Sequence, residues 1–309
     1  MRAIPASVRD AIVRVSKESP NAHPMSILRT GVSLLSHLDP DCEDNSPAAG
    51  LRKSKRLLAQ IPTIIGVCQR TLDGKAPVDP DPSLGHAANL LWSITGQKPD
   101  ELAARIMDVS LVLYAEHDFN ASTFSCRTIS STETDMHSAV CGGIGALKGP
   151  LHGGANEEVM IMLDEIGSMD NVEPYIKGKL ERKELIMGFG HRVYKAYDPR
   201  ATYLKTFAKQ IATDTGNLKL FEMSQKIEGL VLDAKAGKGI FPNVDFYSAT
   251  TYHCLGIKTD LFTCMFAMSR MSGWAGHCIE QLQDNRLIRP QAKYNGPHAA
   301  PYVPMNQRG

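Results

Sequence analysis

Apolar side chains recur at intervals of three and four residues along most of this chain. Val8, Ile12 and Val15 share one face of the segment 5–19, which is the spacing of an amphipathic helix. The same pattern predicts helices over residues 25–38, 51–71, 100–117, 156–166 and 258–282. No segment alternates apolar and polar residues over the length of a typical strand. The pattern therefore predicts an all-α fold.

Breaks in the pattern mark the predicted loops. Residues 39–50 are polar, and residues 73–83 contain several prolines, which interrupt a helix. Asp100 follows Pro99 and is a favoured N-cap for the helix that begins there. The stretch 121–147 is rich in glycine and alanine. We expect a helix there that packs closely, either in the core or at a dimer interface.

Composition narrows the class of protein. The chain has 309 residues, 43% of them hydrophobic and 22% charged, which is ordinary for a globular protein. A net charge of +1 gives no electrostatic reason to expect nucleic acid or a membrane surface as a partner. The cysteine count of seven is odd, and no C-x-x-C pair is present. These features argue against a disulfide framework or a zinc ribbon and favour a cytoplasmic protein.

Candidate chemistry is concentrated in three short polar segments, at residues 149–156, 188–200 and 243–248. They contain His152, His191 and Asp245, residue types that commonly serve as general acids and bases. Each is predicted to lie in a short turn marked by glycine or proline. Loops on a rigid scaffold are frequent sites of chemistry. These three residues are the catalytic candidates.

Each candidate also has a purely structural interpretation. His152 precedes a predicted helix, whose N-terminal dipole keeps a histidine neutral, but it could equally be an ordinary turn residue. Asp245 is flanked by apolar residues, which raise the proton affinity of a carboxylate, although Asp is also a favoured N-cap. The glycines beside His191 do not form G-x-G-x-x-G, so a nucleotide fold is poorly supported.

Several arginines are candidates for binding an anion. Arg270 interrupts an otherwise apolar helix with no acidic residue within one helical turn, and a buried arginine needs an anionic partner. Arg200 lies in the turn Asp198-Pro199-Arg200, and Arg289 precedes a proline. For Arg200 and Arg289 alone, a surface position is the simpler interpretation. His117, at the end of its predicted helix, completes the set, and no metal-ligand spacing accompanies these residues.

The order of these motifs resembles that of citrate synthases, in the short bacterial-type branch that also contains 2-methylcitrate synthases. The resemblance covers residues 2–301. It is carried by His117-Asp118, Gly149-Pro150-Leu151-His152-Gly153, Gly188-Phe189-Gly190-His191, Asp198-Pro199-Arg200, Asn243-Val244-Asp245, Ser269-Arg270 and Ile288-Arg289-Pro290.

The resemblance implies a condensation of acetyl-CoA with oxaloacetate, followed by thioester hydrolysis, with no permanently bound cofactor. Asp245 would remove a proton from the acetyl methyl group, His152 would hydrogen-bond the thioester oxygen, and His191 would protonate the oxaloacetate carbonyl. The implied oxaloacetate-binding residues are His117, Arg200, Arg270, Arg289 and Arg2. The implied CoA-binding residues are Leu185, Ile186, Met187, Gly188, Phe189 and Lys195.

The resemblance also implies an architecture. Residues 1–153 and 257–309 would form a large, dimer-forming helical domain, and residues 154–256 a small domain that closes over the substrate. We expect a homodimer or higher homo-oligomer in which Arg289 reaches the neighbouring subunit's site. Family members carry a further N-terminal segment before the point that matches Arg2. Two alternatives stay open: a 2-methylcitrate synthase that uses propionyl-CoA, and an inactive homologue that acts as a binding or assembly partner.

Overall fold

The computed structural model describes residues 1–191 and 196–308, and it confirms the all-α prediction. Within these residues the only bridge between extended segments pairs Phe189 with Pro242. The α-helices are α1 (Ala6–Glu18), α2 (Pro24–Ser36), α3 (Pro47–Leu72), α4 (His86–Thr95), α5 (Glu101–Tyr114), α6 (Ala121–Ser130), α7 (Met136–Leu147), α8 (Ala155–Ile166), α9 (Met169–Glu181), α10 (Pro199–Asp214), α11 (Leu218–Ala234), α12 (Val244–Cys254) and α13 (Phe262–Gln283). Short 3₁₀ helices, η1 (Thr259–Leu261) and η2 (Met305–Gln307), complete the set.

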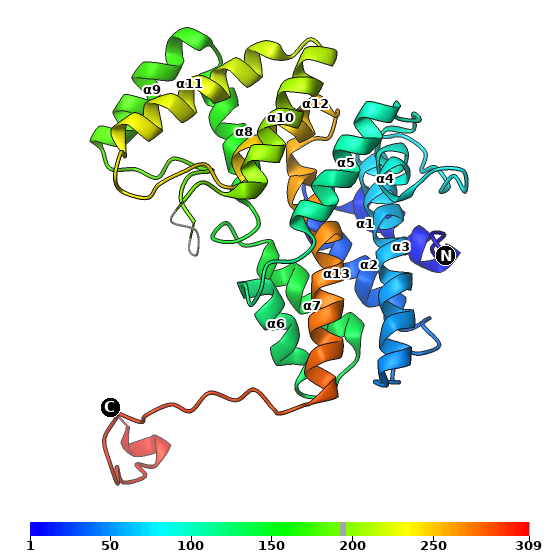
Figure 1. The fold of residues 1–309 in the computed structure, drawn as a ribbon. Coiled ribbons are helices and arrows are strands. Elements are labelled where there is room, and N and C mark those ends of the chain that lie inside the picture. The colour runs from blue at the N-terminus through cyan, green and yellow to red at the C-terminus, as the bar shows by residue number, and fades with distance from the viewer. Residues whose placement is uncertain (192–195, 309) are drawn as a thin grey trace.

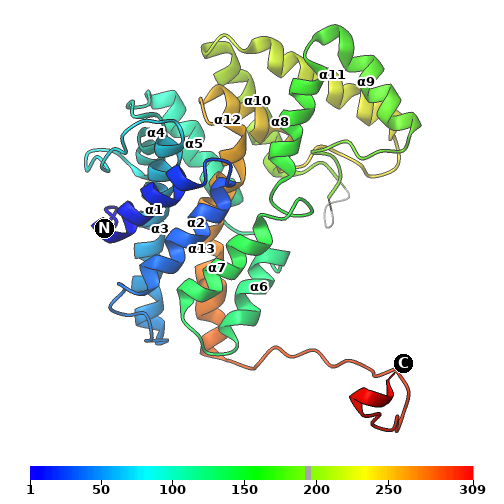
Figure 2. The same cartoon turned by 180° about the vertical axis from the view of Figure 1, so that it is seen from behind.

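The helices form two groups, which Figures 1 and 2 show from opposite sides. In the first group, α13 packs against α3, α6, α7 and α5, and α1 and α2 cover α3. Helix α13 is buried on nearly all sides, as its sequence predicts, and Trp274 is fully enclosed. In the second group, α12 packs against α10 and α8, and α11 packs against α9. The groups meet where α10 contacts α5 and where α8 contacts α13.

Helix boundaries follow local capping chemistry. Asp100 caps α5 by accepting a hydrogen bond from the Ala103 N–H at 2.7 Å, which confirms the predicted N-cap. The predicted loop at residues 39–50 is shorter than expected, because Ser46 caps α3 and Pro47 occupies its first position. That position suits proline, since its N–H would have no helical partner.

Two sequence predictions are wrong in detail. Residues 121–147 form two antiparallel helices, because Asp135 caps a new helix and Glu133 has a left-handed φ of 66° in the turn between them. The small residues do permit close packing: a Cβ at Gly143 would lie 2.5 Å from the Cys126 Sγ. Asp198-Pro199 is the beginning of α10, with Asp198 as its N-cap, and not an isolated turn.

The chain leaves the body of the protein after α13. Residues 284–308 form an extended tail that is mostly exposed and ends near η2 (Figure 1). Among the described residues, no helix combines the length and the apolar character needed to cross a membrane.

Candidate active site

Asp245 lies in the first turn of α12, inside the junction between the two helix groups. It is only 8% exposed, and the Tyr114 hydroxyl at the end of α5 donates a hydrogen bond to its Oδ1 at 2.8 Å. Burial raises the pKa of this carboxyl to about 6, against the lowering effects of Tyr114 and Arg200. Asn243, not Asp245, is the N-cap of α12. The Asp245 carboxylate is therefore left available for chemistry, with a proton affinity suited to a general base.

A short pairing between two loops places His191 beside α12. The Gly190 N–H donates to the Phe241 carbonyl, and the Asn243 N–H donates to the Gly188 carbonyl, each at 2.9 Å. Gly188 has a φ of 80°, and a Cβ there would lie 2.8 Å from both Phe246 and Val159. Only glycine satisfies both the dihedral angle and the space.

His152 follows α7 and precedes α8, and its ring is held by the beginning of α6. The Ser122 N–H donates to His152 Nε2 at 3.2 Å, and the Ser122 hydroxyl lies 2.8 Å from the same nitrogen. Trp274 Nε1 in turn donates to that hydroxyl at 3.1 Å. Since Nε2 accepts a backbone N–H, this network assigns the ring proton to Nδ1. Burial, with a smaller contribution from Arg270, lowers the pKa of His152 to about 4, so the ring is a neutral donor.

The remaining histidines of the candidate set lie together. The ring centroids of His117 and His191 are 5.1 Å apart. Burial lowers the pKa of His117, and the positive charge of Arg200 lowers it further. The structure therefore brings together two histidines that are 74 residues apart in sequence, next to the cationic end of α10.

Arg200 is positioned by its neighbour Asp198. Its Nε and Nη2 donate to the two oxygens of the Asp198 carboxylate at 3.1 and 2.8 Å, and Asp198 is only 1% exposed. Burial lowers the pKa of Arg200, but the bonds to Asp198 raise it by more. The bidentate pair keeps the guanidinium charged and fixed in direction.

Arg270 is the most deeply buried cation of the cluster. It is 1% exposed, its Nε donates to the Tyr114 carbonyl at 2.9 Å, and its guanidinium lies 4.9 Å from the centre of the Phe266 ring. Among the described residues, its Nη1 has no hydrogen-bond partner, and no carboxylate lies within ion-pair distance. Burial and the neighbouring Arg200 lower its pKa to about 10, so it is still charged at neutral pH. A buried guanidinium in this state is typical of a site that receives an anion.

Comparison with known proteins identifies the family. The family model "Citrate synthase, C-terminal domain" matches residues 1–291. The chain is 48% identical over 306 residues to citrate synthase 2 of Bacillus subtilis, covering 99% of this chain and 81% of that protein. The chain belongs to the citrate synthase family.

Other members of the family are similar over the same length. The chain is 40% identical to 2-methylcitrate synthase of Shewanella oneidensis, covering 100% of this chain and 80% of that protein. Its fold matches citrate synthase from Thermoplasma acidophilum, solved as a ternary complex with carboxymethyl coenzyme A and oxaloacetate, with a TM-score of 0.92. That match has 31% identity and covers 99% of this chain and 81% of the solved chain.

The predicted CoA-binding residues lie on the loop between α9 and the paired segment at Gly188. Leu185 is 80% exposed, whereas Ile186 is buried and packs with the core. Met187 and Phe189 are half-buried, and the Phe189 ring lies 4.6 Å from that of Phe246. Lys195 lies outside the described residues. In this loop the exposed Leu185 is therefore followed by Ile186, which anchors the loop to the core.

Two predicted substrate arginines do not join the cluster in this single chain. Arg289 is exposed on the C-terminal tail, which extends away from the body. Arg2 lies at the other end of the chain, where its carbonyl accepts a bond from Thr63 of α3 and its charge lowers the pKa of His86, whose main shift comes from burial. Roles for Arg2 and Arg289 stay predictions.

Sequence reasoning missed residues that position the cluster. The Tyr114 hydroxyl donates to Asp245, and the Tyr114 carbonyl accepts from Arg270. From sequence alone, Tyr114 is indistinguishable from the other apolar positions of α5. Ser122, which fixes the His152 tautomer, lies in the stretch 121–147, whose sequence indicates only close helix packing. Tyr114 precedes His117 by about one helical turn, and that spacing is a signal that could have identified it.

Proposed function

We propose that this member of the family is a citrate synthase, which condenses acetyl-CoA with oxaloacetate and hydrolyses the product to citrate and CoA. The observation that carries the proposal is the buried Asp245 carboxylate, whose pKa is raised to about 6, in one cluster with a neutral His152. A thioester α-proton is weakly acidic, so its removal needs both a base and a donor to the developing oxyanion. The pair supplies both.

The first step forms the enolate of acetyl-CoA. Asp245 takes the proton from the methyl group, and the electrons of the C–H bond move into the thioester carbonyl. The Nδ1–H of His152 donates to that oxygen as negative charge develops. Because Ser122 already occupies Nε2, the donor points in one direction before the substrate arrives.

The second step joins the two substrates. The enolate carbon attacks the ketone carbon of oxaloacetate, and the ketone oxygen takes a proton from His191. Water then attacks the thioester carbonyl, and CoA leaves as the thiol. Oxaloacetate carries two carboxylates, which Arg270 and Arg200 bind together with His117, and to which Arg2 and the Arg289 of a second subunit contribute.

Closure of one domain on the other excludes water from the enolate. We assign residues 1–153 and 257–309 to the large domain and residues 154–256 to the small domain, which correspond to the two helix groups of Figure 1. Asp245 and His191 come from the small domain, whereas His152 and Arg270 come from the large one. The site is therefore built from both domains at their junction, where closure would exclude water.

The proposed protein is a cytoplasmic homodimer or higher homo-oligomer with acyl-CoA as cosubstrate. The cysteines among the described residues are free thiols, as a reducing compartment would keep them. CoA would lie against the loop Leu185, Ile186, Met187, Gly188 and Phe189, with Lys195 near its phosphates.

The test is thiol release from acetyl-CoA, measured with and without oxaloacetate, for the parent chain and for Asp245→Ala. We expect release that requires oxaloacetate and that the variant loses. A parallel assay with propionyl-CoA measures acyl preference, and a higher kcat/KM for propionyl-CoA would indicate a 2-methylcitrate synthase. If a folded, oligomeric sample released no thiol, the enzymatic function would be refuted and the role of a binding or assembly partner would be favoured.

A further inference from the structure

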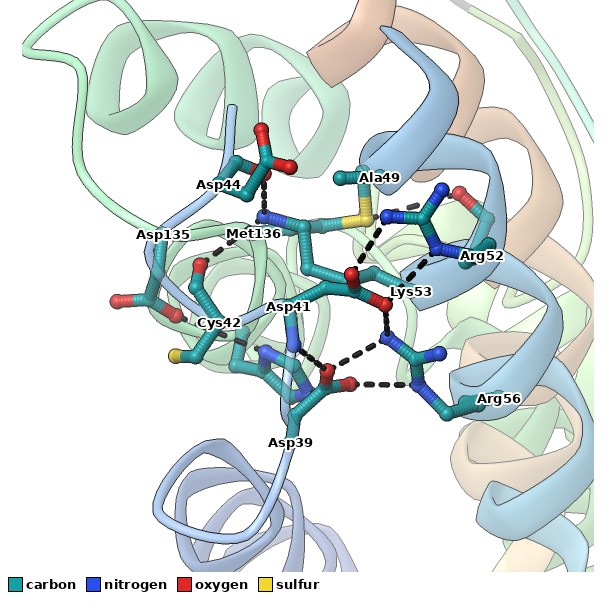
Figure 3. Close-up of polar contacts among 12 residues, drawn as sticks. Asp39, Asp41, Cys42, Asp44, Ala49, Arg52, Lys53, Arg56, Asp135 and Met136 are labelled. Carbon is teal, nitrogen blue, oxygen red and sulfur yellow. Dashed lines mark hydrogen bonds and ion pairs between the residues drawn. The ribbon is translucent and has the colours of Figure 1, made fainter. Parts of the chain in front are cut away.

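The loop between α2 and α3 is fixed by charged side chains at a corner of the large domain (Figure 3). Arg56 of α3 donates to both oxygens of Asp39 at 2.9 and 2.6 Å. Arg52 donates in the same way to Asp41 at 3.1 and 2.5 Å. Lys53, which is 1% exposed, donates to the Cys42 carbonyl at 3.0 Å and to a second carbonyl of the same loop. A polar loop is thereby held in one conformation.

His137, in the first turn of α7, is buried against this loop. It is 1% exposed, and its Nε2 lies 3.5 Å from Asp39 Oδ2. Its Nδ1 lies 3.7 Å from Asp135 Oδ1 and has no hydrogen-bond partner among residues 1–191 and 196–308. A buried nitrogen in this state is costly and calls for an explanation.

The unpartnered nitrogen faces a carboxylate oxygen. A ring that directs an Nε2–H toward Asp39 leaves the Nδ1 lone pair facing Asp135 Oδ1. Two electron-pair donors then face each other, which a cation between them would satisfy.

Cys42 supplies a third ligand at the same point. One ligand atom from each of Cys42, Asp135 and His137 lies within 4.8 Å of the other two. We propose that these three side chains bind a zinc ion, with water in the fourth position. Thiolate, imidazole and carboxylate are the ligands that zinc prefers, and their mixture disfavours calcium and magnesium, which take oxygen ligands.

The side chains around His137 also suit a zinc ligand. Asp39 faces the second nitrogen of His137 and is itself held by Arg56, which is the carboxylate–histidine arrangement that orients a metal ligand. Cys42 and Asp135 are half-buried, so the ion reaches the site from solvent on their side. Ligand atoms around tetrahedral zinc lie roughly 3.3 to 3.8 Å apart, so the side chains draw together by about an ångström on binding.

Zinc binding exchanges a proton for the metal. Burial raises the pKa of the Cys42 thiol to about 11, so the free protein carries S–H. On coordination the S–H bond breaks, the proton goes to solvent and the S–Zn bond forms. The ion would join the α2–α3 loop to the beginning of α7. His152 follows the other end of this helix, which has 12 residues and is about 18 Å long, so the zinc site is separate from the catalytic cluster.

The experiment measures metal binding directly. Protein freed of metal by a chelator is titrated with Zn²⁺ in competition with a chromophoric chelator, and with Co²⁺ to detect thiolate coordination by its absorbance. We expect the parent to bind one zinc ion per chain. Cys42→Ala should weaken zinc binding by about 100-fold or more. Cys141→Ala removes another half-buried thiol, on α7, and should bind as the parent does.

A second measurement needs no substitution. Zn²⁺ should protect Cys42 from alkylation, as read by mass spectrometry of its peptide, while the alkylation rate of Cys141 stays unchanged. Zinc should also raise the melting temperature of the parent but not of Cys42→Ala. Sub-stoichiometric binding, equal affinity in Cys42→Ala, or an unprotected Cys42 would overturn the proposal. Citrate formation does not enter these readouts, so the result is independent of the proposed function.

Discussion

The charged cluster at the α2–α3 loop and the candidate active site use arginines in opposite ways. At the corner, Arg56 donates to Asp39 and Asp41, so its charge is neutralised within the protein. In the active site, Arg270 is more deeply buried, yet its Nε meets only a backbone carbonyl. Among the described residues, no carboxylate lies within ion-pair distance of Arg270.

The difference distinguishes a charge that stabilises the fold, that of Arg56, from a charge that is available to bind a ligand, that of Arg270. Removing one partner of an ion pair leaves the buried partner's charge uncompensated, which destabilises the fold. An unpaired buried charge costs free energy, which its pKa shift to about 10 reflects. Such a cost is tolerated where an anionic ligand recovers it on binding. We therefore expect substitutions at the corner to affect stability and substitutions in the active site to affect activity.

The largest effect is expected from Asp245→Asn. Loss of the base should lower kcat by about 10³- to 10⁴-fold, measured as oxaloacetate-dependent thiol release. Asp260→Asn is a matched control, because burial also raises the pKa of that carboxyl but it lies outside the cluster. A variant Asp245→Asn that retains more than a tenth of the parent kcat would refute the assignment of the base.

The same variant should gain stability at neutral pH. The folded pKa of about 6 lies above the unfolded value near 3.9. The folded state therefore binds this proton more tightly, and the contribution of Asp245 to stability falls as pH rises from about 4 to above 6. Thermal unfolding at pH 5 and pH 8 should show the variant's gain mainly at pH 8. An equal or larger gain at pH 5 would contradict the buried, ionised carboxylate.

Arg270→Met should separate activity from stability. We expect kcat/KM for oxaloacetate to fall about 100-fold, which corresponds to about 3 kcal/mol for a lost bond between charged groups. The melting temperature should change little, because the variant also removes an unpaired buried charge. Arg270→Lys should recover part of the activity, since it restores the charge without the planar guanidinium.

Arg56→Met should give the opposite result. Removing this guanidinium leaves the Asp39 carboxylate, whose side chain is 4% exposed, without its cation. We expect a loss of about 2 kcal/mol in the free energy of unfolding, with kcat/KM within twofold of the parent. Denaturant unfolding and steady-state kinetics on the same sample test both halves. A large loss of kcat/KM in a folded Arg56→Met sample would contradict the claim that Arg56 serves stability and Arg270 serves activity.

The smallest effect is expected from Tyr114→Phe. The Tyr114 hydroxyl stabilises ionised Asp245, so its removal should raise the pKa of the base above about 6. A hydrogen bond of about 1 kcal/mol corresponds to a shift of about one pH unit in the acidic limb of the kcat profile. Activity at pH 8 should then fall less than activity at pH 6. An unshifted profile would show that Tyr114 acts only in packing.

Much of the fold could be predicted from sequence, because the helical spacing of apolar residues is a local property. The helix at Glu101–Tyr114 and its cap Asp100 follow directly from it. The break at residues 131–135 was missed, because small and apolar residues continue on both sides of it. A single capping residue, Asp135, decides where the second helix begins.

The candidate site could be predicted in part. His152 and His191 lie in loops, Asp245 lies in the first turn of α12, and the structure brings these segments to one junction. Their partners could not be found in this way, because Tyr114 and Asp245 are 131 residues apart in sequence. The sequence predicts only that the loop after α2 is polar. The side chains that hold this loop in place come from α3 and α7, which are distant in sequence or lie after it.

The most direct test is the effect of oxaloacetate on the melting temperature of the parent, Arg270→Met and Arg56→Met. At a concentration about 100 times the Kd, binding should raise the melting temperature of the parent by about 4 °C. Arg56→Met should begin at a lower temperature and show the same rise, while Arg270→Met should show little or none. If oxaloacetate raised the melting temperature of Arg270→Met as much as that of the parent, the account would be contradicted, because Arg270 would then not bind the substrate.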